Sequence, residues 1–240
     1  MVSSSFDIVK PHIEECLKMG NEKLDDAKLL RNAKRYPGAI TSYISAYEEI
    51  GQALFLVDKL SINEKIAEND LNNYIKPASH PDKILAHWIT RRDNFNKVTN
   101  TDFEKMKQSK LGKLFSITDT REDAVNKIEE RISIFSKLHK LRQTFDYSRD
   151  LDGHITNRGY DKPTLESLCH LLECECYASY YVVKLLLEFS TVTSFNDVDE
   201  VLSKIASLPT IKKLKKLYQN YNTQTSLNIR NKGLQFIKSF

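Results

Sequence analysis

The residues best suited to chemistry are arginines, a tyrosine and a histidine in the stretch LHKLRQTFDYSRDLDGH. Arg142 and Tyr147 form the spacing R-x4-Y, and Arg149 and His154 form R-x4-H. A guanidinium group binds phosphate through paired hydrogen bonds, and histidine moves protons near neutral pH. The stretch therefore indicates chemistry at a phosphodiester. The alternatives are an ion pair between Arg142 and a carboxylate such as Glu49, and an ordinary loop position for His154.

Other familiar catalytic and metal-binding patterns are missing from the sequence. It contains no GxGxxG, no P-loop, no HExxH and no GxSxG. His80 and His87 lie seven residues apart without an obvious third ligand, so we expect no metal and no cofactor. The four cysteines lack zinc-ligand spacing and are expected to be core thiols in a reducing cytoplasm.

Charge is distributed unevenly along the chain. The net charge is +4, yet Glu200 is the last acidic residue and eight Lys or Arg follow it. The first 200 residues hold the other 28 of the 36 basic residues, against all 32 acidic ones. A basic C-terminal segment on a mildly acidic body favours an anionic partner, with nucleic acid as the first candidate. A solvated helix face and a self-association surface are the alternatives.

The chain carries no pattern typical of a membrane protein. No window is apolar for long enough to span a bilayer, and the N-terminal sequence lacks the basic-then-apolar pattern of a signal peptide. We therefore expect a cytoplasmic protein with no membrane partner. Its 240 residues are enough to bury a full core.

The elements that must position these residues are predicted to be helices, since glycine and proline are few and strand-like alternation is hard to find. A central helix is expected over residues 39–59, where Ile and Tyr recur at helical spacing on one face and small residues on another. Glu48 and Glu49 interrupt this apolar helix. A buried carboxylate is costly, so we expect each to reach solvent or to pair with Arg or Lys.

Periodicity and capping signals predict further helices on either side of the central one. The segments are 6–34, 61–74, 81–95, a weaker one over 100–116, a long one over 120–147 that starts at the Thr120–Asp123 capping signature, one opening at Pro163, and one from Ser194 to Pro209. Pro37 and Gly38 are predicted to form the turn before the central helix. The fold class is therefore all-α.

Three short motifs, in order, resemble the AbiV-type abortive infection proteins. SYISAYEEIGQALFL resembles the central helix of that family, SHPDK (His80 and Lys83) its H-x-x-K element, and LRQTFDYSRDLDGH followed by DKP its arginine-then-tyrosine element. The resemblance covers about residues 35–187. Gln52 stands where a lysine is usual, and Ser-Arg follows Tyr147 in place of an aliphatic–Asp pair.

The family belongs to the HEPN superfamily of helical bundles, many of which are metal-independent endoribonucleases with an R-x4–6-H motif. That motif is commonly brought together with its copy across a dimer. Carried over, Arg142 takes the place of the motif arginine and Tyr147 that of the histidine, although tyrosine, with an ordinary pKa of about 10, is a poor base.

The resemblance implies a HEPN-like helical bundle with additional peripheral helices, divided into a domain over residues 1–195 and a basic C-terminal helical extension over 196–240. It also implies a homodimeric protein of prokaryotic antiviral defence that acts on RNA or the translation machinery. A phage protein is the expected activator.

One functional hypothesis is a ribonuclease in which a 2′-hydroxyl attacks the adjacent phosphorus. Arg142, or Arg149, stabilises the developing charge, His154 or His80 moves protons, and Glu49 orients the arginine.

The second hypothesis is a non-catalytic module that binds a phage protein, RNA or a nucleotide and blocks translation. Glu49, His80, Lys83 and Arg142 then form a buried polar network that fixes the bundle or recognises a ligand. In a third hypothesis this polar network has only a structural role.

Overall fold

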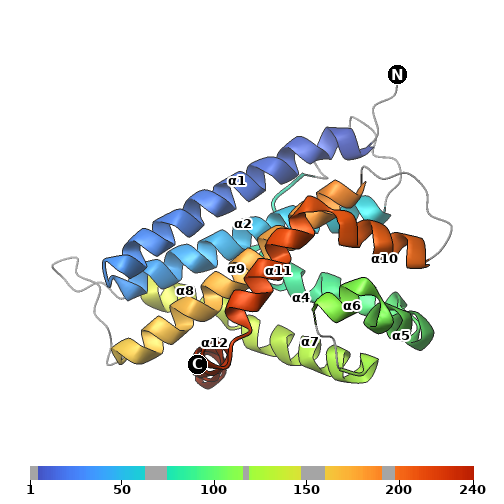
Figure 1. Ribbon diagram of the computed structural model, residues 1–240. Helices are drawn as coiled ribbons and strands as arrows, with labels where there is room; N and C mark the ends of the chain where they lie inside the picture. The colour runs from blue at the N-terminus through green and yellow to red at the C-terminus, as the bar shows by residue number, and fades with distance from the viewer. Residues whose placement is uncertain (1–4, 63–74, 116–118, 147–159, 191–197) are drawn as a thin grey trace.

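A computed structural model of the chain shows long α-helices packed side by side (Figure 1). The structure describes residues 5–62, 75–115, 119–146, 160–190 and 198–240. Every regular element within these ranges is an α-helix and no strand occurs in them, which confirms the all-α fold class.

The described ranges contain three long helices and eight shorter ones. They are α1 (Ser5–Asn32), α2 (Tyr36–Ile62), α4 (His80–Lys97), α5 (Asn100–Gln108), α6 (Lys110–Leu114), α7 (Arg121–Phe135), α8 (Leu138–Asp146), α9 (Lys162–Ser190), α10 (Val198–Ser207), α11 (Pro209–Tyr221) and α12 (Gln224–Ser239).

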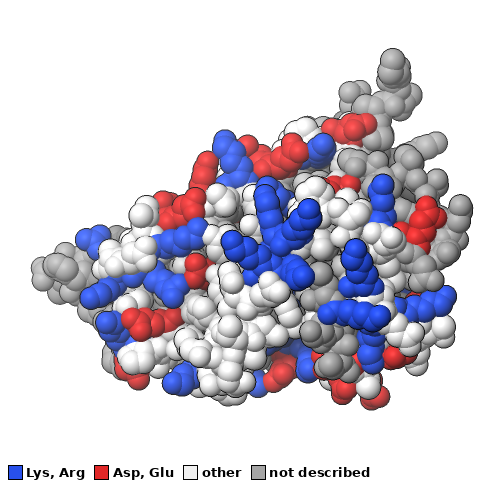
Figure 2. Space-filling model, in the orientation of Figure 1, with Lys and Arg blue, Asp and Glu red and all other residues white. Residues whose placement is uncertain are grey.

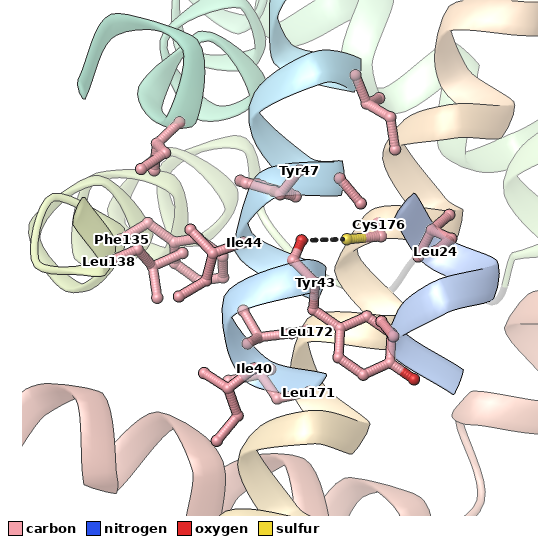
Figure 3. Packing of buried hydrophobic residues seen from close by; sticks show 14 of the residues in the cluster. Leu24, Ile40, Tyr43, Ile44, Tyr47, Phe135, Leu138, Leu171, Leu172 and Cys176 are labelled. Carbon is pink, nitrogen blue, oxygen red and sulfur yellow. Dashed lines mark hydrogen bonds between the residues drawn. The ribbon is translucent and has the colours of Figure 1, made fainter. Parts of the chain in front are cut away.

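Helix α2 is the centre of the molecule, as its apolar sequence predicts. It packs against α1, α4, α8 and α9, and its Tyr43, Ile44 and Tyr47 are completely buried. Figure 3 shows these side chains against residues of α7 and α9, with Cys176 donating a hydrogen bond to the carbonyl oxygen of Tyr43 at 3.4 Å. Burying a large apolar side chain contributes about 1.5–3 kcal/mol, so this face of α2 holds the helices together.

The predicted turn at Pro37 and Gly38 is wrong, because these residues lie in the first turn of α2. Proline is tolerated there, since the first N–H groups of a helix have no partner within it. The chain instead reverses just before, where Lys34 adopts the left-handed conformation (φ 60°) and the N–H of Arg35 donates to the carbonyl oxygen of Leu30 at 2.8 Å.

The long helix predicted over residues 120–147 is two helices. The Thr120–Asp123 capping box opens α7 as expected, but α7 ends at Phe135 and α8 begins at Leu138. Helical periodicity continues through both segments, so the sequence pattern does not reveal the short break between them. Its consequence is that α8 packs on α2 while α7 packs on α4.

The C-terminal helices cover α9. Both α11 and α12 contact α9, and α12 also contacts α7 (Figure 1). Pro209 begins α11 instead of only ending the preceding helix, and it takes the favoured first-turn position. Of the helix predicted over residues 61–74, Ser61 and Ile62 are instead the last two residues of α2, so the predicted start at Ser61 is wrong. Residues 63–74 and the boundary between residues 195 and 196 lie outside the described residues. Within the described ranges, none of the helices has the length and apolar character needed to cross a bilayer.

Candidate functional site around Glu48

The two carboxylates in the middle of α2 face different neighbours, because consecutive residues of a helix point about 100° apart. Glu49 accepts a hydrogen bond from Lys23 of α1, with Nζ and Oε1 3.0 Å apart. Glu48 points toward α4 and α8 and contacts His80 and Arg142. The expectation that carboxylates on this helix pair with basic residues is confirmed.

Arg142 is bound by Glu48, so the expected pair with Glu49 is wrong. Its Nη1 donates to Oε2 of Glu48, and its Nε donates to Oδ2 of Asp146 at 3.3 Å. Only 4% of the Glu48 side chain is exposed, against 25% for Arg142. The guanidinium plane is therefore held on two edges, while its third nitrogen, Nη2, has no acceptor among the described residues.

His80 shares the same carboxylate oxygen. Its Nδ1 lies 3.0 Å from Oε2 of Glu48, and because a carboxylate only accepts, Nδ1 carries the proton. The side chain is 56% exposed, and its Nε2 has no partner in the part of the chain that the structure describes. A carboxylate behind an imidazole fixes the tautomer and the orientation of the ring.

A second histidine, His139, stacks on His80 with ring centroids 5.6 Å apart and an interplanar angle of 16°. Its Nε2 lies 3.1 Å from the amide nitrogen of Gln143. Since an amide nitrogen only donates, Nε2 of His139 accepts and its Nδ1 carries the proton. We call Glu48, His80, His139, Arg142 and Asp146 the Glu48 cluster.

Short local features hold His80 in place. Ser79 caps α4, with its hydroxyl oxygen accepting from the N–H of Asp82 at 3.3 Å, and His80 is the first helical residue. The segment before the cap is tied to α2, because Oε1 of Gln52 accepts from the N–H of Ala78 at 2.9 Å. Gln52, which departs from the family pattern, thus anchors the entry to α4.

The crossing of α2 and α4 depends on Gly51. A Cβ atom at this position would lie 1.9 Å from the carbonyl oxygen of Lys83, so only glycine permits the observed approach. One turn along α4, His87 is completely buried, stacks on Tyr47 at 3.8 Å, and donates from Nε2 to the carbonyl oxygen of Tyr47 at 3.0 Å. Burial lowers the pKa of His87 to about 3, so the ring is neutral. His87 is structural.

The other predicted site residues divide into two groups. Lys83 is half-buried on the Glu49 side, where its charge acts on the thiol of Cys16. Burial raises the pKa of Cys16 to about 11, with Glu49 raising it further and Lys83 opposing this. Lys83 and Glu49 therefore lie near Cys16. Neither residue belongs to the ion pair between Arg142 and Glu48. Tyr147, Arg149 and His154 lie outside the described residues.

Sequence reasoning missed Glu48, His139 and Asp146 as members of the site. A usable signal existed for two of them: His139 stands three residues before Arg142 and Asp146 four after it, which places all three on one face of α8. No equivalent signal distinguishes Glu48 from Glu49, since the choice depends on how α2 is rotated within the bundle. In the described ranges no set of three or more His, Cys, Asp or Glu side chains is placed to hold a metal ion.

The described helices form an all-α bundle around α2, which is consistent with the HEPN class. A family model described as AbiV, within HEPN, matches residues 11–144, more than half of the chain. The chain belongs to the AbiV family of HEPN proteins, as its motifs predict. The matched segment contains the main members of the Glu48 cluster and ends just before Tyr147. No curated protein matched the chain. No solved structure matched it.

Proposed function

We propose that the chain is an antiphage abortive infection protein that cleaves RNA without a metal ion, with the Glu48 cluster as its active site. The observation that carries this proposal is the arrangement of Arg142 and the exposed His80 on one buried carboxylate oxygen. Glu48 keeps a phosphate-binding group and a proton-transfer group next to each other, which is what cleavage of a phosphodiester requires.

In the proposed reaction the 2′-hydroxyl of the RNA attacks the adjacent phosphorus. An imidazole takes the hydroxyl proton as the O–P bond forms, and a second group donates a proton to the departing 5′ oxygen. The products are a 2′,3′-cyclic phosphate and a 5′-hydroxyl. The unpaired Nε2 of His80 and the neighbouring imidazole of His139 are proposed for these proton transfers. Nη2 of Arg142 is proposed to stabilise the negative charge on the non-bridging oxygens of the phosphoryl group.

A basic surface on α11 supports RNA as the substrate. Figure 2 shows Lys and Arg side chains gathered over this helix, and Lys212, Lys213 and Lys216 are exposed. None of the three has a carboxylate partner among the described residues. Unpaired lysines of this kind attract the phosphate backbone without reading sequence. We also propose a homodimer, by analogy with HEPN enzymes that assemble their site from two copies.

A non-catalytic interaction module is the second candidate, and a specific contact favours it. Two carboxylates, Glu48 and Asp146, already occupy two of the three guanidinium nitrogens of Arg142. An arginine held this way also serves as a rigid surface for a phage protein or the translation machinery. Growth arrest would then occur without loss of cellular RNA.

The deciding experiment incubates the purified protein with RNA in excess EDTA, with and without lysate from phage-infected cells, and detects 2′,3′-cyclic phosphate ends. We expect His80→Ala to lower the cleavage rate by about 10²- to 10⁴-fold, the usual contribution of a general acid or base. His12→Ala, a histidine of α1 outside the cluster, should cleave like the wild type. Arg142→Lys keeps the positive charge but loses the several hydrogen-bond donors of the planar guanidinium group, so we expect it to cleave RNA slowly.

Cleavage that survives in both Arg142→Ala and the double variant His80→Ala/His139→Ala would overturn the nuclease proposal. Growth arrest by a wild-type protein that leaves RNA intact would favour the interaction module.

A further inference from the structure

A second polar site, separate from the Glu48 cluster, lies in a pocket of about 330 Å³. Its walls come from α4, α7, α9, α11 and α12, so the C-terminal helices, which follow the matched family segment, close it. It shares no residue with the Glu48 cluster. Its volume falls within the range of about 300–1,000 Å³ that is usual for small-molecule sites.

The pocket is lined by three arginines and one carboxylate. Arg91 comes from α4, Arg131 from α7 and Arg230 from α12, while Glu175 of α9 is the single acidic residue. Glu175 is almost completely buried and accepts from Nη2 of Arg230 at 3.4 Å. Only one of the three positive charges is thus matched by an ion pair.

Arg91 and Arg131 have no carboxylate within ion-pair distance among the described residues. Burial lowers the pKa of Arg131; Glu175 opposes this effect, and the like charge of Arg230 adds to it. Glu130, the other acid that acts on Arg131, is hydrogen-bonded to Lys238 at the surface. Repulsion among buried like charges favours binding of an anion between them.

The same region is short of hydrogen-bond acceptors. Nη1 of Arg131, Nε of Arg230 and Nε1 of Trp88 are buried and have no hydrogen-bond partner in the part of the chain that the structure describes. Buried donors are normally satisfied, and leaving one unsatisfied costs about 1–3 kcal/mol. Small movements of the arginines would let a ligand with several acceptor oxygens satisfy them.

Aromatic side chains also line the pocket. The guanidinium carbons of Arg91 and Arg131 lie 4.5 Å and 6.0 Å from the centre of the Trp88 ring, within the range of cation–π contacts. Phe115 and Tyr218, which also line the pocket, pack edge-on with ring centroids 5.5 Å apart. These surfaces suit a planar ring.

We propose that this pocket binds a small anion that carries a planar ring, with the size and chemistry of a mononucleotide. The arginines contact the anionic group and the aromatic wall contacts the ring. The proposal is independent of RNA cleavage, because it concerns different residues and its test contains no RNA.

The sequence provides the probe, since Trp88 is the only tryptophan of the chain. Its fluorescence, excited at the red edge of its absorption, is followed while adenosine 5′-monophosphate is added to the full-length protein. We expect a saturable change with a Kd of about 1 mM or tighter, the range in which a few charged hydrogen bonds suffice. Adenosine and inorganic phosphate, titrated separately, should each bind at least about 10-fold more weakly, since each makes only part of the contacts.

Neighbouring arginines of α4 give a matched pair of variants. Arg91 lines the pocket, whereas Arg92 pairs with Asp93 and Glu129 outside it. We expect Arg91→Gln to weaken binding about 10- to 100-fold, the effect of losing a charged hydrogen bond, and Arg92→Gln to leave it unchanged. Circular dichroism and the melting temperature check that each variant is folded, and Arg230→Gln serves as a second pocket variant.

Equal weakening by Arg91→Gln and Arg92→Gln would assign the effect to general charge and overturn the proposal. So would the absence of a saturable change with the nucleotide, or phosphate binding as tightly as the nucleotide.

Discussion

Two arginine sites in this protein differ in how their charge is balanced. In the Glu48 cluster one arginine, Arg142, is held by two carboxylates, and a histidine shares one of them. In the pocket beside Trp88, three arginines accompany the single carboxylate of Glu175, and only Arg230 forms an ion pair with it. Helix α4 contributes to both, with His80 at its start and Arg91 about three turns further along.

The difference shows which site is organised before a ligand arrives. An arginine with two acids is fixed in orientation and nearly neutralised, which suits a group that must stay in position during a reaction. Three arginines with one acid keep a positive surplus in a partly buried place, which an incoming anion would relieve. The first site is therefore pre-organised, and the second is incomplete without an anion.

The largest expected effect comes from the crossing that carries both sites. Gly51→Ala puts a methyl group against the carbonyl oxygen of Lys83, which is backbone and must shift. We expect a loss of about 3 kcal/mol of unfolding free energy, at the upper end for overpacking, measured by urea denaturation. Gly38→Ala is the control, since its nearest neighbours are the flexible end of Leu30 at 3.5 Å and beyond. An unchanged midpoint for Gly51→Ala would mean that the helices adjust freely and that their spacing does not hold the two sites.

A pair of acid-to-amide variants tests the charge balance directly. Glu175→Gln leaves three arginines without a carboxylate, so we expect a loss of about 2–3 kcal/mol of unfolding free energy, partly restored by added phosphate or nucleotide. Glu48→Gln leaves Arg142 its contact with Asp146, and should cost about 1 kcal/mol without restoration by anions. Thermal and urea unfolding with and without the anion measure both. A larger loss of unfolding free energy in Glu48→Gln than in Glu175→Gln would contradict the proposed difference in charge balance. So would equal recovery of the two variants on addition of the anion.

The smallest expected effect is a pH dependence of stability that is due to His87. This residue lies on α4 between His80 of one site and Arg91 of the other. Its folded pKa of about 3 lies below the ordinary value of about 6.5, so the unfolded chain binds the proton more readily. The stability due to the neutral ring is present above pH 6.5 and is lost as the pH falls from there toward 3. Between pH 7.5 and 5.5 the expected loss of unfolding free energy is about 1 kcal/mol.

His87→Gln isolates this contribution, because glutamine keeps a donor for the carbonyl oxygen of Tyr47 and does not titrate. Burial also lowers the pKa of His170, so the wild type retains other pH-dependent terms of the same sign. The informative quantity is thus the slope of unfolding free energy against pH, compared between the wild type and the variant. Identical slopes would show that His87 is not the group responsible.

Much of the fold was predictable from local patterns. The apolar face of α2, the capping box at Thr120 and Asp123 and the proline-rich entry to α4 all appear as expected. The break between α7 and α8 was missed because helical periodicity continues across it. The turn at Pro37 was misplaced because proline suits a first helical turn as well as a turn between helices.

The candidate site was predictable only in part. Arg142 and His80 were identified from residue type and spacing, and the structure brings them together on one carboxylate. The assignment of Glu49 as the partner failed, since neighbouring residues of a helix differ by 100° in direction and nothing in the local sequence tells which one faces α8.

Reading the amino-acid sequence alone is enough to identify the helical class, the central position of α2, the family, and the arginine and histidine at the site. These properties depend on composition, periodicity and short motifs, which act locally. The packed helices were needed to show that Glu48 holds Arg142 and His80, and that Arg91, Arg131 and Arg230 meet in one pocket. Those arrangements join residues up to 139 positions apart in the chain, and they depend on the rotation and crossing of packed helices, which no local pattern encodes.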